Sequence, residues 1–153
     1  MLKLSCQNAN SVKSNLLLVG CFDMKSGEEP RMHVGHMSLI HAAKKLGNVI
    51  VLLNDDESMR KLKGENRPFY DAFTRLKYIT QVFEVECDVF NGTEEDVIRA
   101  IKIHDIDFIV KGLDTVLDKK YDHIKGSKHV SGIIYIDHGN LDIHVSDQGM
   151  IDK

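Results

Sequence analysis

The chain has 153 residues, of which 42% are hydrophobic and 28% are charged, and its formal net charge is −3. This length and composition are typical of one globular domain with an ordinary core. The slight negative charge argues against a dedicated binder of nucleic acid or anionic membranes, which usually carries a clear basic excess. No apolar run is long enough for a membrane helix and no signal-peptide core is present, so we expect a single cytoplasmic domain over residues 1–153.

Short apolar runs alternate with amphipathic stretches along the chain. The apolar runs predict strands, and apolar residues at helical spacing predict helices. In chain order the expected elements are a strand at 16–19, a helix at 37–46, a strand at 49–53, a helix at 71–83, a weak strand at 85–90, a helix opening at Thr93, and strands at 108–110 and 133–136. This alternation predicts an α/β fold: a single-domain, Rossmann-like, doubly wound parallel sheet of about five strands, with a core over about 16–136 and a short C-terminal tail.

The three cysteines predict neither a disulfide framework nor a zinc site. Cys6, Cys21 and Cys87 are odd in number and no two of them form a close pair. We interpret them as reduced thiols, with Cys21 and Cys87 packed in or near strands.

Glycine, histidine and lysine collect after the predicted strands. Residues 20–23 and 33–36 follow the first strand, residues 61–64 follow the second, and residues 111–114 follow the fourth. In open parallel sheets, ligands bind beyond the carboxyl ends of the strands. The composition of this edge therefore predicts an anion site, and phosphate is the natural anion.

His33 and His36 stand three residues apart at the start of a predicted helix, with Gly35 between them. This spacing puts both imidazoles on one helix face. A helix N-terminus attracts phosphate, and glycine lets a phosphate approach the backbone closely. The pair can donate hydrogen bonds to charge that develops on a phosphoryl group. Two surface or capping histidines remain an alternative, and a zinc pair is disfavoured because no third ligand follows at helical spacing.

The motifs resemble a known family when they are taken in order. Four segments carry the resemblance: Gly20-Cys21-Phe22-Asp23, His33-Val34-Gly35-His36, Lys63-Gly64-Glu65-Asn66-Arg67-Pro68 and Val110-Lys111-Gly112-Leu113-Asp114. The chain is similar to the cytidylyltransferase-like nucleotidyltransferases, whose mark is His-x-Gly-His. Its Lys-Gly-x-x-Arg-Pro and Val-Lys-Gly-x-Asp segments are most similar to the adenylyltransferase domain that makes ADP-heptose from heptose 1-phosphate. Glycerol-3-phosphate cytidylyltransferase is the next most similar.

The resemblance implies phosphate-binding roles for three groups of residues. Gly20, Cys21 and Phe22 would present backbone amides to the nucleotide phosphates. His33 and His36 would bind the α- and β-phosphates in the transition state. Lys61 or Lys63 would neutralise the transferring phosphate. Without the resemblance, the two lysines would be assigned to a solvated loop.

Further roles follow from the same resemblance. Arg75 would hold the pyrophosphate end or the acceptor phosphate, although alone it would be read as a surface charge. Lys111, Gly112 and Asp114 would border the base and ribose. Asp23 either fixes the turn or touches a ligand or metal. The partners implied are ATP or CTP, with Mg²⁺ carried by the triphosphate, and a phosphorylated small acceptor. Family members often form dimers, so a homodimer is an expectation as well.

Two segments depart from the family pattern. Nine residues, Met24 to Met32, separate Asp23 from His33, where the family has a much shorter connection. Gly27 and Pro30 predict a loop, either a lid or acceptor-contacting loop or a plain surface insertion. The tail retains only Ser146 of the Ser-Thr-Thr-like stretch that grips the triphosphate in the family, and Asp147 adds an unfavourable negative charge.

These observations leave four hypotheses. The first is an adenylyltransferase for a sugar 1-phosphate, and the second a cytidylyltransferase for an alcohol phosphate. The third, prompted by the altered tail, is a nucleotide-binding module that has lost turnover. The fourth is an α/β domain with an accidental His-x-Gly-His.

Overall fold

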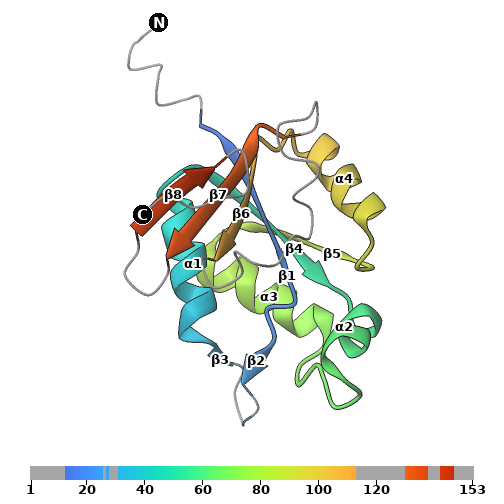
Figure 1. Cartoon of the computed structure of the whole chain (residues 1–153). Coiled ribbons are helices and arrows are strands. Elements are labelled where there is room, and N and C mark those ends of the chain that lie inside the picture. The colour runs from blue at the N-terminus through green and yellow to red at the C-terminus, as the bar shows by residue number, and fades with distance from the viewer. Residues whose placement is uncertain (1–12, 26, 28–30, 113–129, 138–141, 147–153) are drawn as a thin grey trace, which may run out of the picture.

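The structure is a computed structural model that describes residues 13–25, 27, 31–112, 130–137 and 142–146 (Figure 1). The elements in chain order are β1 (Asn15–Gly20), β2 (Met24–Lys25), β3 (Arg31–Met32), α1 (Val34–Lys44), β4 (Asn48–Asn54), α2 (Asp56–Lys63), α3 (Ala72–Phe83), β5 (Glu86–Phe90), α4 (Glu94–Ile103), β6 (Phe108–Gly112), β7 (Gly132–Asp137) and β8 (Asp142–Ser146).

The main sheet has six strands in the order β5-β4-β1-β6-β7-β8. β1 lies at its centre and pairs in parallel with both β4 and β6. The outer pairs β4–β5 and β6–β7 are also parallel, whereas β8 pairs antiparallel with β7. The expected Rossmann-like parallel sheet of five strands with flanking helices is therefore confirmed. The direction in which the chain adds strands reverses between β1 and β6, which is the switch point where such folds bind ligands.

Apolar side chains fill both faces of the sheet because successive strand residues point to opposite sides. Leu16 and Leu18 pack with α1 and α3 in one cluster, and Leu17 packs with α4 in the other. Five consecutive buried residues in β4, Val49 to Leu53, show the same two-sided burial. The near-continuous apolar runs in the sequence follow from this arrangement.

Four elements were not predicted from the sequence: α2, the hairpin strands β2 and β3, and β8. α2 buries a single apolar side chain, Met59, so it carries no apolar stripe. The N-cap residue was the feature of the sequence that could have indicated this helix, because the Asp55 side chain accepts a hydrogen bond from the Ser58 N–H at 2.8 Å. α1 begins at Val34, three residues before the predicted start at Met37.

Cys21 and Cys87 are half-buried free thiols, as expected. The Cys21 Sγ donates to Asn54 Oδ1 at 3.6 Å. Burial is the main cause that raises the pKa of the Cys87 thiol to about 12. Cys6 lies outside the described residues.

Candidate active site

Three strands end side by side at the switch point. Gly20, the last residue of β1, is in register with Leu53 near the end of β4. On the other side, Leu18 is in register with Val110, so β6 ends with Lys111 and Gly112 beside the end of β1. The glycine and lysine segments that the sequence placed after separate strands are thus neighbours in space.

The two histidines of the His-x-Gly-His motif lie together at the start of α1. Their ring centroids are 5.9 Å apart, with one ring edge-on to the other at 89°. His36 also packs against Phe22, 5.1 Å away between ring centroids. His33 is exposed, whereas His36 and Gly35 are half-buried. One imidazole can therefore meet a ligand from solvent while the other is held in place by the loop after β1.

The N-terminus of α1 differs from the other helix starts in the described part of the chain. Asp55, Asp71 and Thr93 cap α2, α3 and α4 with side-chain hydrogen bonds. The N-cap of α1 is His33, which makes no side-chain cap bond. A helix start without an oxygen cap keeps its positive dipole end open to an external anion. This position suits a phosphate between the two histidines.

The loop after β1 has an unusual backbone. Phe22 has φ = 46°, a left-handed conformation that non-glycine residues rarely adopt. The ring is buried and folds back over Gly20, where an added Cβ would lie 3.1 Å from Phe22 Cε2. Such strained conformations concentrate at functional sites. The absence of a side chain at Gly20 lets Phe22 take the position from which it supports His36.

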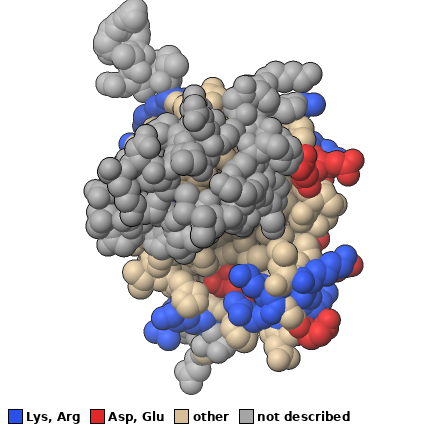
Figure 2. Space-filling model, in the orientation of Figure 1, with Lys and Arg blue, Asp and Glu red and all other residues tan. Residues whose placement is uncertain are grey.

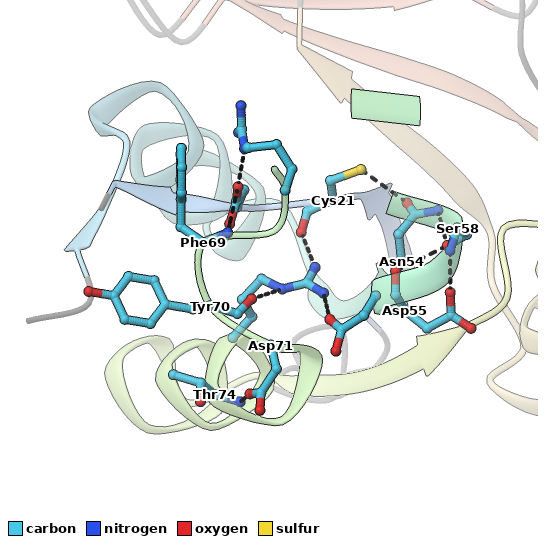
Figure 3. A network of polar contacts seen from close by, with 12 residues as sticks. Cys21, Asn54, Asp55, Ser58, Phe69, Tyr70, Asp71 and Thr74 are labelled. Atoms are coloured by element: carbon cyan, nitrogen blue, oxygen red, sulfur yellow. Dashed lines mark hydrogen bonds and ion pairs between the residues drawn. The ribbon is translucent and has the colours of Figure 1, made fainter. Parts of the chain in front are cut away.

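Asp23 fixes this turn, which was one of the two roles expected for it. The carboxylate is buried and accepts hydrogen bonds from the Met24 N–H at 2.9 Å and the Phe69 N–H at 3.2 Å. It also forms an ion pair with Arg67 Nε at 2.5 Å. The Arg67 guanidinium in turn lies 4.6 Å from the centroid of the Phe69 ring. Asp23 thereby joins the loop after β1 to the segment between α2 and α3, where Phe69 is labelled in Figure 3.

Arg75 does not occupy the phosphate-binding position that the resemblance implied. Its side chain is fully buried in the protein. It donates to the carbonyls of Cys21 at 2.7 Å and Tyr70 at 2.9 Å, and to the Asp56 carboxylate at 2.8 Å (Figure 3). Because three protein acceptors already engage the guanidinium, Arg75 links the loop after β1, the start of α2 and the start of α3. This correction replaces a substrate contact with a positioning role.

Lys61 and Lys63 lie on the last turn of α2 rather than in a loop, and both are exposed. Lys61 forms an (i, i+4) ion pair with Glu57 at 3.7 Å, with both side chains about three-quarters exposed. An exposed pair of this kind is weak, about 0.3–0.5 kcal/mol, so it would not prevent Lys61 from turning to a phosphate. Their expected role as phosphate ligands stays a prediction.

The expected nucleotide ligands near the C-terminus have different outcomes. Lys111 and Gly112 end β6 next to the end of β1, and their contact with the base and ribose stays a prediction. Asp114 and Asp147 lie outside the described residues. Ser146 ends β8 in register with Ile133, which lies at the amino-terminal side of β7. The antiparallel return of β8 therefore carries Ser146 away from the strand ends that meet at the switch point. The expected contact between Ser146 and the nucleotide stays a prediction.

The structure also brings in residues that sequence reasoning did not single out. Asp56 and Asn54 join the polar network behind the site, and the Asn54 amide donates to Ser58 Oγ at 3.0 Å (Figure 3). Their position directly after a buried strand was the available signal. Among the described residues, no three His, Cys, Asp or Glu side chains are arranged to hold a metal ion. Within the same residues, no helix is long and apolar enough to cross a membrane.

A model of the cytidylyltransferase-like family matches residues 17–146. The chain belongs to the cytidylyltransferase-like family. This match runs from β1 to β8 and confirms the resemblance inferred from the motifs, including the His-x-Gly-His signature at the start of α1. The cytidylyltransferase-like family is one of nucleotidyltransferases, so the arrangement at the switch point can be interpreted in those terms.

Curated relatives support the same assignment. The chain is 33% identical over 128 residues to "Bifunctional protein HldE" of Campylobacter fetus subsp. fetus, which covers 83% of the chain and 25% of the relative. It is 38% identical over 114 residues to the protein of the same name from Actinobacillus succinogenes, covering 72% of the chain and 21% of the relative. The chain thus spans about a quarter or less of these relatives' lengths.

A solved structure shares the fold. The crystal structure of the lipopolysaccharide core biosynthesis protein from Thermoplasma volcanium GSS1 matches with a TM-score of 0.57 and 24% identity. The match covers 81% of this chain and 96% of that chain.

Proposed function

We propose that the protein transfers a nucleoside monophosphate from ATP, or alternatively CTP, to a phosphorylated small acceptor and releases pyrophosphate. The acceptor we favour is a sugar 1-phosphate such as heptose 1-phosphate, because the Lys-Gly-x-x-Arg-Pro and Val-Lys-Gly-x-Asp segments are most similar to the adenylyltransferase domain that makes ADP-heptose. One observation carries the proposal: His33 and His36 lie edge-to-face at a helix start without an oxygen cap, where β1, β4 and β6 end.

The proposed reaction is an in-line displacement. A phosphate oxygen of the acceptor attacks the α-phosphorus of the nucleotide, a new P–O bond forms, and the bond to the bridging oxygen of the leaving group breaks. Pyrophosphate departs with the negative charge, so donors from His33 and His36 stabilise it as it develops. Catalysis then consists of positioning and charge stabilisation, with no covalent enzyme intermediate.

Mg²⁺ would arrive with the triphosphate and neutralise part of its charge. Among the described residues, Asp23 is the carboxylate nearest in sequence to the histidines, and it is committed to Met24, Arg67 and Phe69. The phosphates themselves are therefore the expected ligands of the ion, and Lys61 or Lys63 would supply the protein's positive charge. Lys111 and Gly112 would border the base and ribose.

The test is pyrophosphate release in the presence of Mg²⁺, with ATP and CTP each offered against sugar 1-phosphates and alcohol phosphates. ATP with a sugar 1-phosphate is the expected active pair. His36→Ala should lower kcat by about a hundredfold or more, roughly 3 kcal/mol of barrier, without loss of folding. His41→Ala is the matched control, because His41 is an exposed residue on the same helix, packed against Phe83 rather than His33. Near-normal turnover in His36→Ala would refute the assignment.

A nucleotide-binding module without turnover is the second candidate, and the altered tail favours it, because Ser146 alone remains of the Ser-Thr-Thr-like stretch. A protein of this kind would bind nucleotide but release no pyrophosphate with any acceptor. Nucleotide at a hundred times its Kd would then still stabilise the protein by about 2.7 kcal/mol, which thermal unfolding can detect. Turnover with CTP and an alcohol phosphate would instead identify the cytidylyltransferase alternative.

A further inference from the structure

β2 and β3, the described strands between Asp23 and His33, pair as a small antiparallel hairpin that is anchored in the core. Met24 and Met32 pair across it, and both side chains are buried among the residues packed against one face of the sheet. The Tyr70 hydroxyl donates to the Gly27 carbonyl at 2.6 Å, which ties the hairpin to the segment before α3. The described part of this segment is thus attached to the domain at both its strands and its turn.

The outward face of the hairpin carries two cations opposite each other. Lys25 and Arg31 are a cross-strand pair, and both are exposed. Side chains directly opposite on an antiparallel pair have Cβ atoms about 5 Å apart, and like charges there are destabilising. Among the described residues, no carboxylate forms an ion pair with either. The segment also contains Glu28 and Glu29, which lie outside the described residues. The like-charge pair itself adds no stability to the two paired strands.

This charge pair continues into the His-x-Gly-His motif. Arg31, Met32 and His33 follow one another in extended backbone, with φ = −61° and ψ = 143° at His33. Alternate residues of an extended chain face the same side. Met32 faces the core, so Arg31 and His33 share the exposed side, next to the N-terminus of α1. Lys25, Arg31 and His33 form a row that leads to the proposed transfer site.

The same end of the molecule has further positive charge. Arg60, Lys61 and Lys63 are exposed on α2. On the face shown in Figure 2, lysines and arginines gather at the end of the molecule where Figure 1 places the hairpin and α2.

We propose that the β2–β3 hairpin is a phosphate-binding element in which Lys25 and Arg31 hold a phosphoryl group next to His33. This inference rests on the proposed function for its substrate, because the phosphate belongs either to the acceptor or to the nucleotide. A phosphate placed between the two cations converts their repulsion into two attractive contacts, of which the arginine contact can be bidentate. The hairpin then acts as a substrate-contacting element rather than as a neutral surface insertion.

The first experiment measures binding of inorganic pyrophosphate and tripolyphosphate by calorimetry, without nucleotide or acceptor. The Lys25→Ser/Arg31→Ser double variant should bind at least about tenfold more weakly than wild type. The matched control is Arg99→Ser/Lys102→Ser on exposed positions of α4, which removes the same charge and should bind as wild type. The charge-conserving Lys25→Arg/Arg31→Lys variant should restore binding. Wild-type affinity in the Lys25/Arg31 variant, an equal loss in the control, or no binding by wild type would overturn the proposal.

A second readout is thermal stability without ligand. Removing a like-charge pair should leave Tm unchanged or raise it, whereas a fall in Tm would mean that Lys25 and Arg31 support the fold and would overturn the proposal. In steady-state assays, a raised KM for the acceptor identifies the acceptor phosphate, and a raised KM for the nucleotide identifies the triphosphate. Unchanged KM values for both the acceptor and the nucleotide would overturn the proposal that the hairpin binds a substrate phosphate. If wild type binds pyrophosphate through the hairpin but catalyses no transfer, the proposed function fails and the hairpin site stands.

Discussion

Replacement of Arg75 by methionine tests whether a buried guanidinium holds the site together. Arg75 is fully buried and donates to Cys21, Tyr70 and Asp56. Hydrogen bonds that involve a charged group contribute about 1.5–3 kcal/mol each, and loss of one partner of a buried ion pair typically costs about 3–5 kcal/mol. The Asp56 side chain is 35% exposed and keeps access to water, so the expected loss of unfolding free energy lies at the lower end of this range. We expect Arg75→Met to lose about 3 kcal/mol of unfolding free energy.

Urea unfolding followed by circular dichroism measures this loss. The matched control is Arg99→Met, which breaks an exposed (i, i+3) pair with Asp96 on α4 and should cost about 0–1 kcal/mol. In a double-mutant cycle, Arg75→Met and Asp56→Asn should couple by roughly 0.5–3 kcal/mol. An Arg75→Met loss no larger than that of the control would refute the reasoning. Turnover of the folded variant should also fall, because Arg75 positions the loop that ends in Phe22 and Asp23.

Two smaller changes give further predictions. Gly20→Ala puts a Cβ 3.1 Å from the ring of Phe22, which supports His36, so kcat should fall while Tm changes little; an unchanged kcat would contradict this role. Asp71→Ala removes the N-cap of α3 and should cost about 1 kcal/mol at neutral pH, with Asp71→Asn as the control that keeps an acceptor. The hydrogen bond from the Thr74 N–H lowers the pKa of the Asp71 carboxyl. The contribution of this charge is therefore present above about pH 4 and disappears as pH falls through the folded pKa; an equal Asp71→Ala loss at neutral and strongly acidic pH would contradict it.

Much of the fold was predictable because its signals are local. The apolar runs around Leu17 and Val51 mark strands buried on both faces, and the helices on either side of them have periodic apolar positions. α2 was not predicted because its residues are almost all polar and its stability depends on caps and on Met59. The hairpin was not predicted because two-residue strands are too short to show an alternating apolar pattern. Its methionines are recognised as core residues only once their cluster is known.

Part of the candidate site was likewise predictable from local sequence, and part depended on the tertiary structure. The order of motifs along the sequence determined the family and the pairing of His33 with His36, because an N-cap residue and the third residue of its helix meet at the helix start wherever the helix lies. Only the tertiary structure decided the role of Arg75, since burial depends on contacts with residues up to 54 positions away in the chain. It also decided the position of Ser146, because the direction of β8 is set by its pairing with β7. Local spacing determines which side chains share an element, whereas strand pairing and burial determine which of them reach the site.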